Sequence, residues 1–158
     1  MSSCEHEATF YRAALLLGLV DGGEVIAWAD AVIARDVAVP HALLDVSVTA
    51  PGDLSALRIA LQPLARDDEA PDVVHAILDR ARSDLERGRR NIGDTVTVLA
   101  QVRRFLTVTT AVVDALDAFQ DDYMLAAAGV IGDVATIERN VRSWLAHYAG
   151  AEAMLLTA

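Results

Sequence analysis

The sequence predicts an all-α fold, a compact bundle or orthogonal array of seven to eight helices joined by short loops. In most segments apolar residues recur every three to four positions, which is the spacing of one helix face. Residues that begin or end helices separate these segments, and short connections favour antiparallel neighbours. The chain has 158 residues, the size of one domain, so we expect residues 1–158 to form a single helical domain with 1–7 as a frayed tail.

Four helices are predicted in the first half of the chain, over residues 8–18, 21–36, 40–47 and 53–63. Asp21 stands three residues before Glu24, as in a capping box at the start of the second helix. Pro40 suits the first turn of the third helix, and Asp53 suits the N-cap of the fourth.

Four further helices are predicted in the second half, over residues 71–88, 94–106, 112–130 and 133–148, after an acidic loop at 67–69. Gly88 is placed to end the first of them. The segment 94–106 is rich in β-branched residues and also fits a strand. Its apolar spacing of three to four residues, with no pairing strand in view, favours a helix.

Composition narrows the classes of partner. The net charge of −10 and pI of about 4.6 disfavour nucleic-acid binding and favour a basic protein partner. The apolar run 13–20 is shorter than the ~20 residues of a membrane span. The amino terminus lacks the basic start of a secretory signal, so we expect a cytoplasmic protein without membrane attachment. All 13 basic residues are arginine, which indicates GC-rich coding and a bacterial origin.

Residues that could carry chemistry are few. Cys4 is the single cysteine, which excludes an intramolecular disulfide and a cysteine zinc cluster. Two pairs, His41 with Asp45 and His75 with Asp79, have the four-residue spacing of one helix face. Each pair could ligate a metal, or act as a catalytic base (His) with the carboxylate (Asp) that orients it. The alternative is an ordinary pair on the helix surface. No nucleophile or phosphate-binding motif is present, so we predict no catalytic residue, metal or cofactor.

The acidic residues after position 112 form the most informative pattern. Asp114, Asp117 and Asp121 fall on one helical stripe, and Met124 and Leu125 extend the helix beyond it. One interpretation is a plain amphipathic helix whose second half enters the core. The other is an acidic stripe that runs into an exposed apolar patch, as protein interfaces do. We take these five residues as the candidate partner-binding site.

A concentration of arginines gives this acidic chain a charge dipole. It consists of Arg80, Arg82, Arg87, Arg89, Arg90, Arg103 and Arg104. We expect some of these side chains to compensate helix carboxyl ends and others to pair with the acidic loop. An acidic partner is the alternative.

The run GLVDGGEVIAWADAVIARD, followed by Pro40 and ALLDVSV, resembles small, acidic helical proteins of bacteria. Proteins of that size and charge often act as immunity partners of toxins, and this analogy assigns no residue a role. We therefore favour a non-enzymatic interaction module, an immunity-type inhibitor or adaptor with a basic partner. A metal-dependent or acid–base enzyme using the His/Asp pairs and a structural homodimer are the alternatives.

Overall fold

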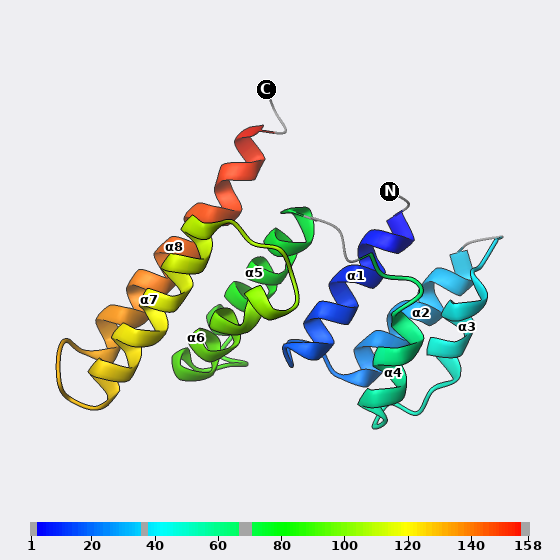
Figure 1. Ribbon diagram of the computed structural model, residues 1–158, viewed down its shortest axis with the longest axis horizontal. Coiled ribbons are helices and arrows are strands. Elements are labelled where there is room, and N and C mark those ends of the chain that lie inside the picture. The colour runs from blue at the N-terminus through cyan, green and yellow to red at the C-terminus, as the bar shows by residue number, and fades with distance from the viewer. Residues whose placement is uncertain (1–2, 36–37, 67–70, 156–158) are drawn as a thin grey trace. The chain divides into compact units, whose positions relative to one another are not determined.

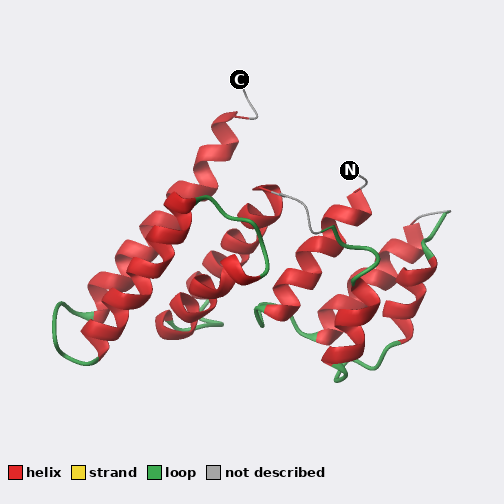
Figure 2. Cartoon of the chain, in the orientation of Figure 1, coloured by secondary structure: helices red, strands yellow, loops and turns green. Residues whose placement is uncertain are grey.

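Every regular element in the described residues, 3–35, 38–66 and 71–155, is a helix (Figures 1 and 2). This computed structural model therefore confirms the predicted all-α class. Its elements are α1 (Ser3–Leu16), α2 (Gly22–Arg35), α3 (His41–Val48), α4 (Leu54–Leu61), α5 (Pro71–Glu86), α6 (Ile92–Gln101), the short 3-10 helix η1 (Val102–Arg104), α7 (Thr110–Ala127) and α8 (Val134–Leu155).

The amino-terminal segment differs from its prediction. We expected residues 1–7 to be a frayed tail, but α1 begins at Ser3. Contacts of Glu7 account for the helical structure of this segment. Its carboxylate accepts a hydrogen bond of 2.7 Å from Trp28 Nε1 and pairs with Arg35 at 3.1 Å. These contacts tie the first turns of α1 to α2.

Residues 94–104 of the segment 94–106 are helical, as their apolar spacing indicated. They belong to α6 and η1, in which Val96, Leu99 and Val102 are buried on one face. The predicted acidic loop at 67–69 and the expected end of the second helix at Asp36 lie outside the described residues.

The chain divides into two compact units, Met1–Val73 and Val74–Ala158. Unit 1 contains α1 to α4, and unit 2 begins in the first turn of α5. Each unit buries its own apolar side chains. The largest in unit 1 are Leu43, Leu57, Leu61, Val25 and Val32, and in unit 2 Ile77, Leu99, Leu145, Val96 and Val102.

In unit 1, α2 packs on α3, α3 on α4, and α1 on both α4 and α2. Small side chains permit the close approach of α1, because Ala8, Ala13 and Ala14 are all buried. In unit 2, α6 packs on α7 and α7 on α8. Larger groups join α5 to α8: the rings of His75 and Tyr148 stack with their centroids 4.3 Å apart.

The turn between α1 and α2 repeats in the turn between α5 and α6, 70 residues later. Gly18 and Gly88 have φ angles of 69° and 67°, and the surrounding backbone hydrogen bonds correspond one for one. Asp21 and Asn91 then cap the following helices, and each side-chain oxygen accepts from a backbone N–H at 2.8 Å. The same local chemistry thus builds the same turn twice.

The repeat continues to the last helix of each unit. Asp53 caps α4 and Asp133 caps α8, each accepting from the backbone N–H three residues later at 2.9 Å. Buried apolar residues follow at the fourth and eighth positions after each cap: Leu57 and Leu61 in α4, Ile137 and Val141 in α8. Each unit therefore has the same order of four helices, although α7 and α8 are longer than α3 and α4.

Candidate partner-binding surface

The acidic stripe of α7 lies on the side away from the core, as its spacing predicted. Asp114 and Asp121 are exposed, whereas Val112 and Leu116 on the opposite face are buried. Asp117 is only partly exposed and forms an ion pair with Arg103 at the end of η1. The helix therefore holds the three predicted carboxylates along one side, two of them fully open to solvent.

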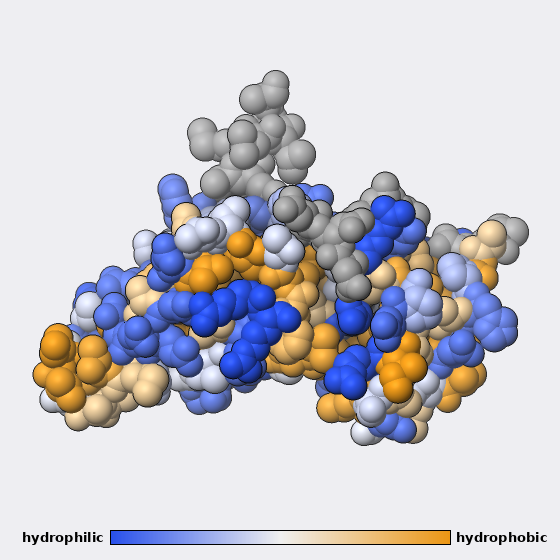
Figure 3. Space-filling view, viewed as in Figure 1, coloured by the Kyte–Doolittle hydropathy of each residue, from blue (hydrophilic) through white to orange (hydrophobic). Residues whose placement is uncertain are grey.

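The apolar end of α7 is exposed rather than buried. Met124 is 62% exposed and Leu125 is 40% exposed, and in the loop that follows Val130 and Ile131 are 64% and 68% exposed. We call these four side chains the apolar tip. Figure 3 shows apolar residues gathered over the α7–α8 loop, at the lower left of the view. The interpretation in which the second half of α7 enters the core is wrong, apart from the buried Ala126.

A fixed turn presents the apolar tip. Gly129 has a φ of 70° and its N–H donates to the carbonyl of Ala126 at 3.0 Å, while Val130 N–H donates to the carbonyl of Leu125 at 2.9 Å. This pair of bonds is the Schellman motif, which ends a helix and defines the path of the chain after it. The tip is therefore positioned by backbone hydrogen bonds, and its exposure follows from the geometry of the helix end.

Charge and apolar surface meet at this helix end. Asp121 lies three and four positions before Met124 and Leu125, so their side chains are neighbours on the helix surface. Asp122 is also exposed beside them. A cluster of apolar side chains bordered by carboxylates is suited to a partner that combines apolar anchors with basic groups.

Several of the arginines concentrated between Arg80 and Arg104 are engaged by carboxylates of their own unit. Arg82 lies 2.7 Å from Asp79, whose hydrogen bond raises the pKa of the Arg82 guanidinium. Arg80 lies 3.2 Å from Asp84. Pairing of these side chains with the acidic loop at 67–69 concerns residues outside the described part. The pairs of Arg80 and Arg82 join residues three or four positions apart within α5, whereas Arg103 pairs with Asp117, 14 positions away.

The two His/Asp pairs are not equivalent. His41 Nδ1 lies 3.6 Å from Asp45 Oδ2, and both side chains are exposed. His75 instead stacks on Tyr148, while Asp79 is held by Arg82. In the described residues no three His, Cys, Asp or Glu side chains come together as a metal site would require. The first pair, His41 with Asp45, is thus a surface contact. In the second, His75 contacts Tyr148 and Asp79 contacts Arg82.

Val130 and Ile131 were not among the predicted site residues. A local signal was present, because Gly129 and Gly132 bracket them, and both glycines have positive φ angles. Two large apolar residues between two such glycines sit in a tight turn, where few neighbouring side chains can cover them.

Within the described residues, no helix combines the length and apolar character needed to cross a membrane. No protein family, curated protein or solved structure matches the chain.

Proposed function

We propose that the protein is a non-enzymatic interaction module, an immunity-type inhibitor or adaptor, that binds a basic partner through α7 and the α7–α8 loop. The observation that carries this proposal is the exposed apolar tip (Met124, Leu125, Val130 and Ile131) at the end of the acidic stripe. Apolar side chains that are exposed in one group, and held there by a defined turn, are typical of surfaces that a partner covers.

The chemistry of the partner follows from the charges around the tip. Asp114, Asp121 and Asp122 are exposed on α7, and the whole chain has a net charge of −10. Such a surface attracts cationic groups and speeds their encounter, while apolar contacts at the tip would supply most of the affinity. The expected partner surface therefore carries aliphatic or aromatic anchors surrounded by arginine or lysine.

A defined peptide probe tests this proposal. We would titrate the full chain against a fluorescein-labelled helical peptide with leucines on one face and arginines on the other, and follow fluorescence anisotropy. We expect saturable binding whose dissociation constant rises as salt is added. Met124→Asp and Ile131→Asp should each weaken binding at least tenfold, and Asp121→Lys should weaken it most at low salt.

Matched controls come from exposed apolar residues of unit 1. Val48 and Ile59 are 82% and 62% exposed, so Val48→Asp and Ile59→Asp make the same chemical change on helices of unit 1. These variants should bind the peptide as the parent chain does. Equal binding by all four aspartate variants, or binding that salt does not affect, would contradict the proposal. Light scattering that shows a dimer lost in Ile131→Asp would instead assign the tip to a second copy of the chain.

A further inference from the structure

A pocket lies between α1 and α4 in unit 1. Its volume is about 290 Å³, and it is lined by Leu15, Leu16, Leu54, Ser55 and Arg58. The three leucines provide an apolar wall, and Leu54 remains 53% exposed although it faces this pocket. Ser55 and Arg58 are three positions apart on α4, so their polar groups border the same side.

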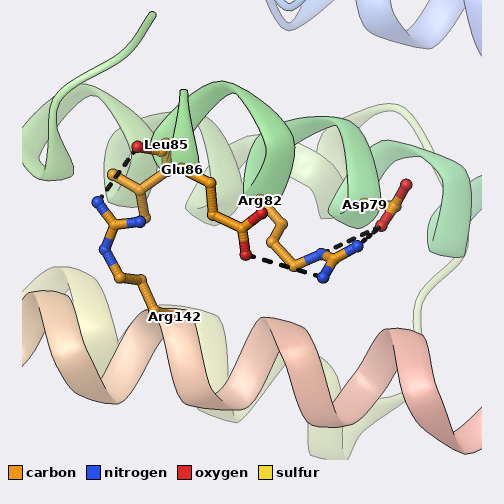
Figure 4. Close-up of polar contacts among 5 residues, drawn as sticks. All are labelled: Asp79, Arg82, Leu85, Glu86 and Arg142. Atoms are coloured by element: carbon orange, nitrogen blue, oxygen red, sulfur yellow. Dashed lines mark hydrogen bonds and ion pairs between the residues drawn. The ribbon is translucent and has the colours of Figure 1, made fainter. Parts of the chain in front are cut away.

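The internal repeat supplies a direct comparison, because α5 and α8 of unit 2 correspond to α1 and α4 of unit 1. There Arg142 donates a hydrogen bond of 3.2 Å to the carbonyl of Leu85, the counterpart of Leu15, and pairs with Glu138 at 2.6 Å. Figure 4 shows this side chain reaching from α8 to α5. Glu86, the counterpart of Leu16, pairs with Arg82 at 3.7 Å. In unit 2, Arg142 thus connects α8 to α5, while the ion pairs of Glu86 and Glu138 each lie within one helix.

Unit 1 has different residues at each of these positions. Leu16 stands in place of Glu86, and Gln62 stands in place of Arg142. Arg58 stands in place of Glu138, so the charge at that position is reversed. In the described residues Arg58 has no carboxylate within ion-pair distance, whereas Glu138 is paired. At the same fold position, unit 2 therefore has a hydrogen bond from Arg142 to a backbone carbonyl, and unit 1 has a largely apolar pocket bordered by Arg58.

We propose that this pocket binds an aliphatic carboxylate. The hydrocarbon part would lie against Leu15, Leu16 and Leu54, and the carboxylate would accept hydrogen bonds from the Arg58 guanidinium and the Ser55 hydroxyl. Guanidinium is the group best suited to a carboxylate, because its parallel N–H donors match the two oxygens. A free fatty acid and the carboxyl terminus of a peptide that ends in leucine share this chemistry.

Calorimetric titration of the full chain with butanoate, hexanoate and octanoate tests the apolar part of the site. We expect affinity to rise about fourfold for each added methylene, until the pocket is filled. Octanol should bind at least tenfold more weakly than octanoate, because it lacks the charge that Arg58 recognises. No binding of octanoate, or equal binding of octanol and octanoate, would overturn the proposal.

Variants locate the site. Arg58→Gln keeps a polar, exposed side chain and should weaken octanoate binding at least tenfold, whereas Arg104→Gln, an equally exposed arginine of unit 2, should leave it unchanged. Leu16→Glu installs the unit 2 residue and should abolish binding, with circular dichroism to confirm that the helices remain. Unchanged binding by Arg58→Gln would overturn the assignment.

Two peptides separate the possible sources of the carboxylate. Acetyl-alanyl-leucine with a free carboxyl terminus and its amide differ only in the charged group. Binding of the acid at least tenfold tighter than that of octanoate would assign the site to a peptide terminus, and the reverse order would assign it to a fatty acid. Equal binding of the acid and the amide would contradict recognition of a carboxylate.

Discussion

In unit 1 the helix before the glycine turn buries Ala14, whereas the equivalent helix of unit 2 buries a carboxylate, that of Asp84, at 4% exposure. Arg80 Nε lies 3.2 Å from both oxygens of Asp84, and Arg89 lies 3.7 Å from one of them. The backbone carbonyls of Ala14 and Asp84 nevertheless accept the same two turn hydrogen bonds. The turn thus depends on the backbone and on glycine, and it tolerates either an apolar or an ionic side chain beneath it.

The contacts that close each unit differ in the same way. In unit 1 small residues on α1 allow it to pack closely on α4, and a pocket remains beside them. In unit 2 the rings of Tyr148 and Trp144 stack at 5.2 Å, and Arg142 reaches across to α5. The contacts between α8 and α5 in unit 2 thus use an aromatic ring and a charged side chain, whereas α1 of unit 1 packs with small residues. The same order of helices thus occurs with side chains of different chemistry in the two units.

The largest effect is expected from breaking the buried ion pair of unit 2. Arg80→Ala should lower the free energy of unfolding by about 3 kcal/mol, because it leaves Asp84 desolvated with only the more distant Arg89. Asp84→Ala should cost less, since it removes the charge that must be buried and restores the residue type of Ala14. Trp144 fluorescence in a Trp28→Phe background reports unfolding of unit 2. A greater loss for Asp84→Ala than for Arg80→Ala would contradict this account.

A smaller effect, equal in both units, is expected at the repeated glycine. Gly18→Ala and Gly88→Ala should each destabilise the chain by about 1–2 kcal/mol, because an L side chain is strained at positive φ. An added Cβ would meet nothing within 4 Å at either position, so the cost comes from the backbone alone. Chemical denaturation measures it. Gly52→Ala is the control, since its Cβ is also unobstructed but its φ lies outside the left-handed region. Unequal losses at positions 18 and 88 would show that the two turns are not energetically equivalent.

The smallest effect concerns pH and the cap of α8. The hydroxyl and the backbone N–H of Thr136 both donate to Asp133 and lower its pKa below the ordinary value of 3.8. The contribution of this carboxylate to stability is therefore complete above 3.8 and is lost as the pH falls through the lower pKa of the folded state. Thr136→Val removes the hydroxyl, the first of these donors, and should reduce the dependence of unfolding free energy on pH in that acid window. The residue equivalent to Thr136 is Ala56, which has no hydroxyl, so the control is Thr97→Val, which removes a hydroxyl that donates to the carbonyl of Gly93 rather than to a carboxylate. An unchanged pH dependence in Thr136→Val would contradict the role of the hydroxyl.

Much of the helical architecture was predictable because its signals are local. The apolar spacing of residues 94–106 favoured a helix in spite of their β-branched content, and Asp53 and Asp133 act as caps where the sequence placed helix starts. The repeat is also visible in the sequence. Residues 70 positions apart correspond: Leu15 with Leu85, Gly18 with Gly88, Asp21 with Asn91, and Gly23 with Gly93. The offset between the copies changes from 70 residues at the glycine turn to 80 at the last helix, so no single period relates the two halves.

The candidate surface was predictable only in part. The spacing of Asp114, Asp117 and Asp121 places them on one side of a helix, but it does not show that Asp117 is paired with Arg103. Arg103 lies 14 residues away in the chain, and such a contact depends on how η1 packs beside α7. The sequence was likewise consistent with either burial of Met124 and Leu125 in the core or their exposure in an apolar patch.

By itself the sequence determined the helices, their caps and the acidic side of α7, because these follow from interactions between residues a few positions apart. Tertiary structure decided which apolar side chains are covered, since coverage depends on distant helices that come to lie beside them. The division into two units, the exposed apolar tip and the pocket between α1 and α4 belong to this second class. In unit 2 Arg142 on α8 reaches the carbonyl of Leu85 on α5, a contact between residues 57 positions apart. Unit 1 has no arginine at that position, and its groove remains open.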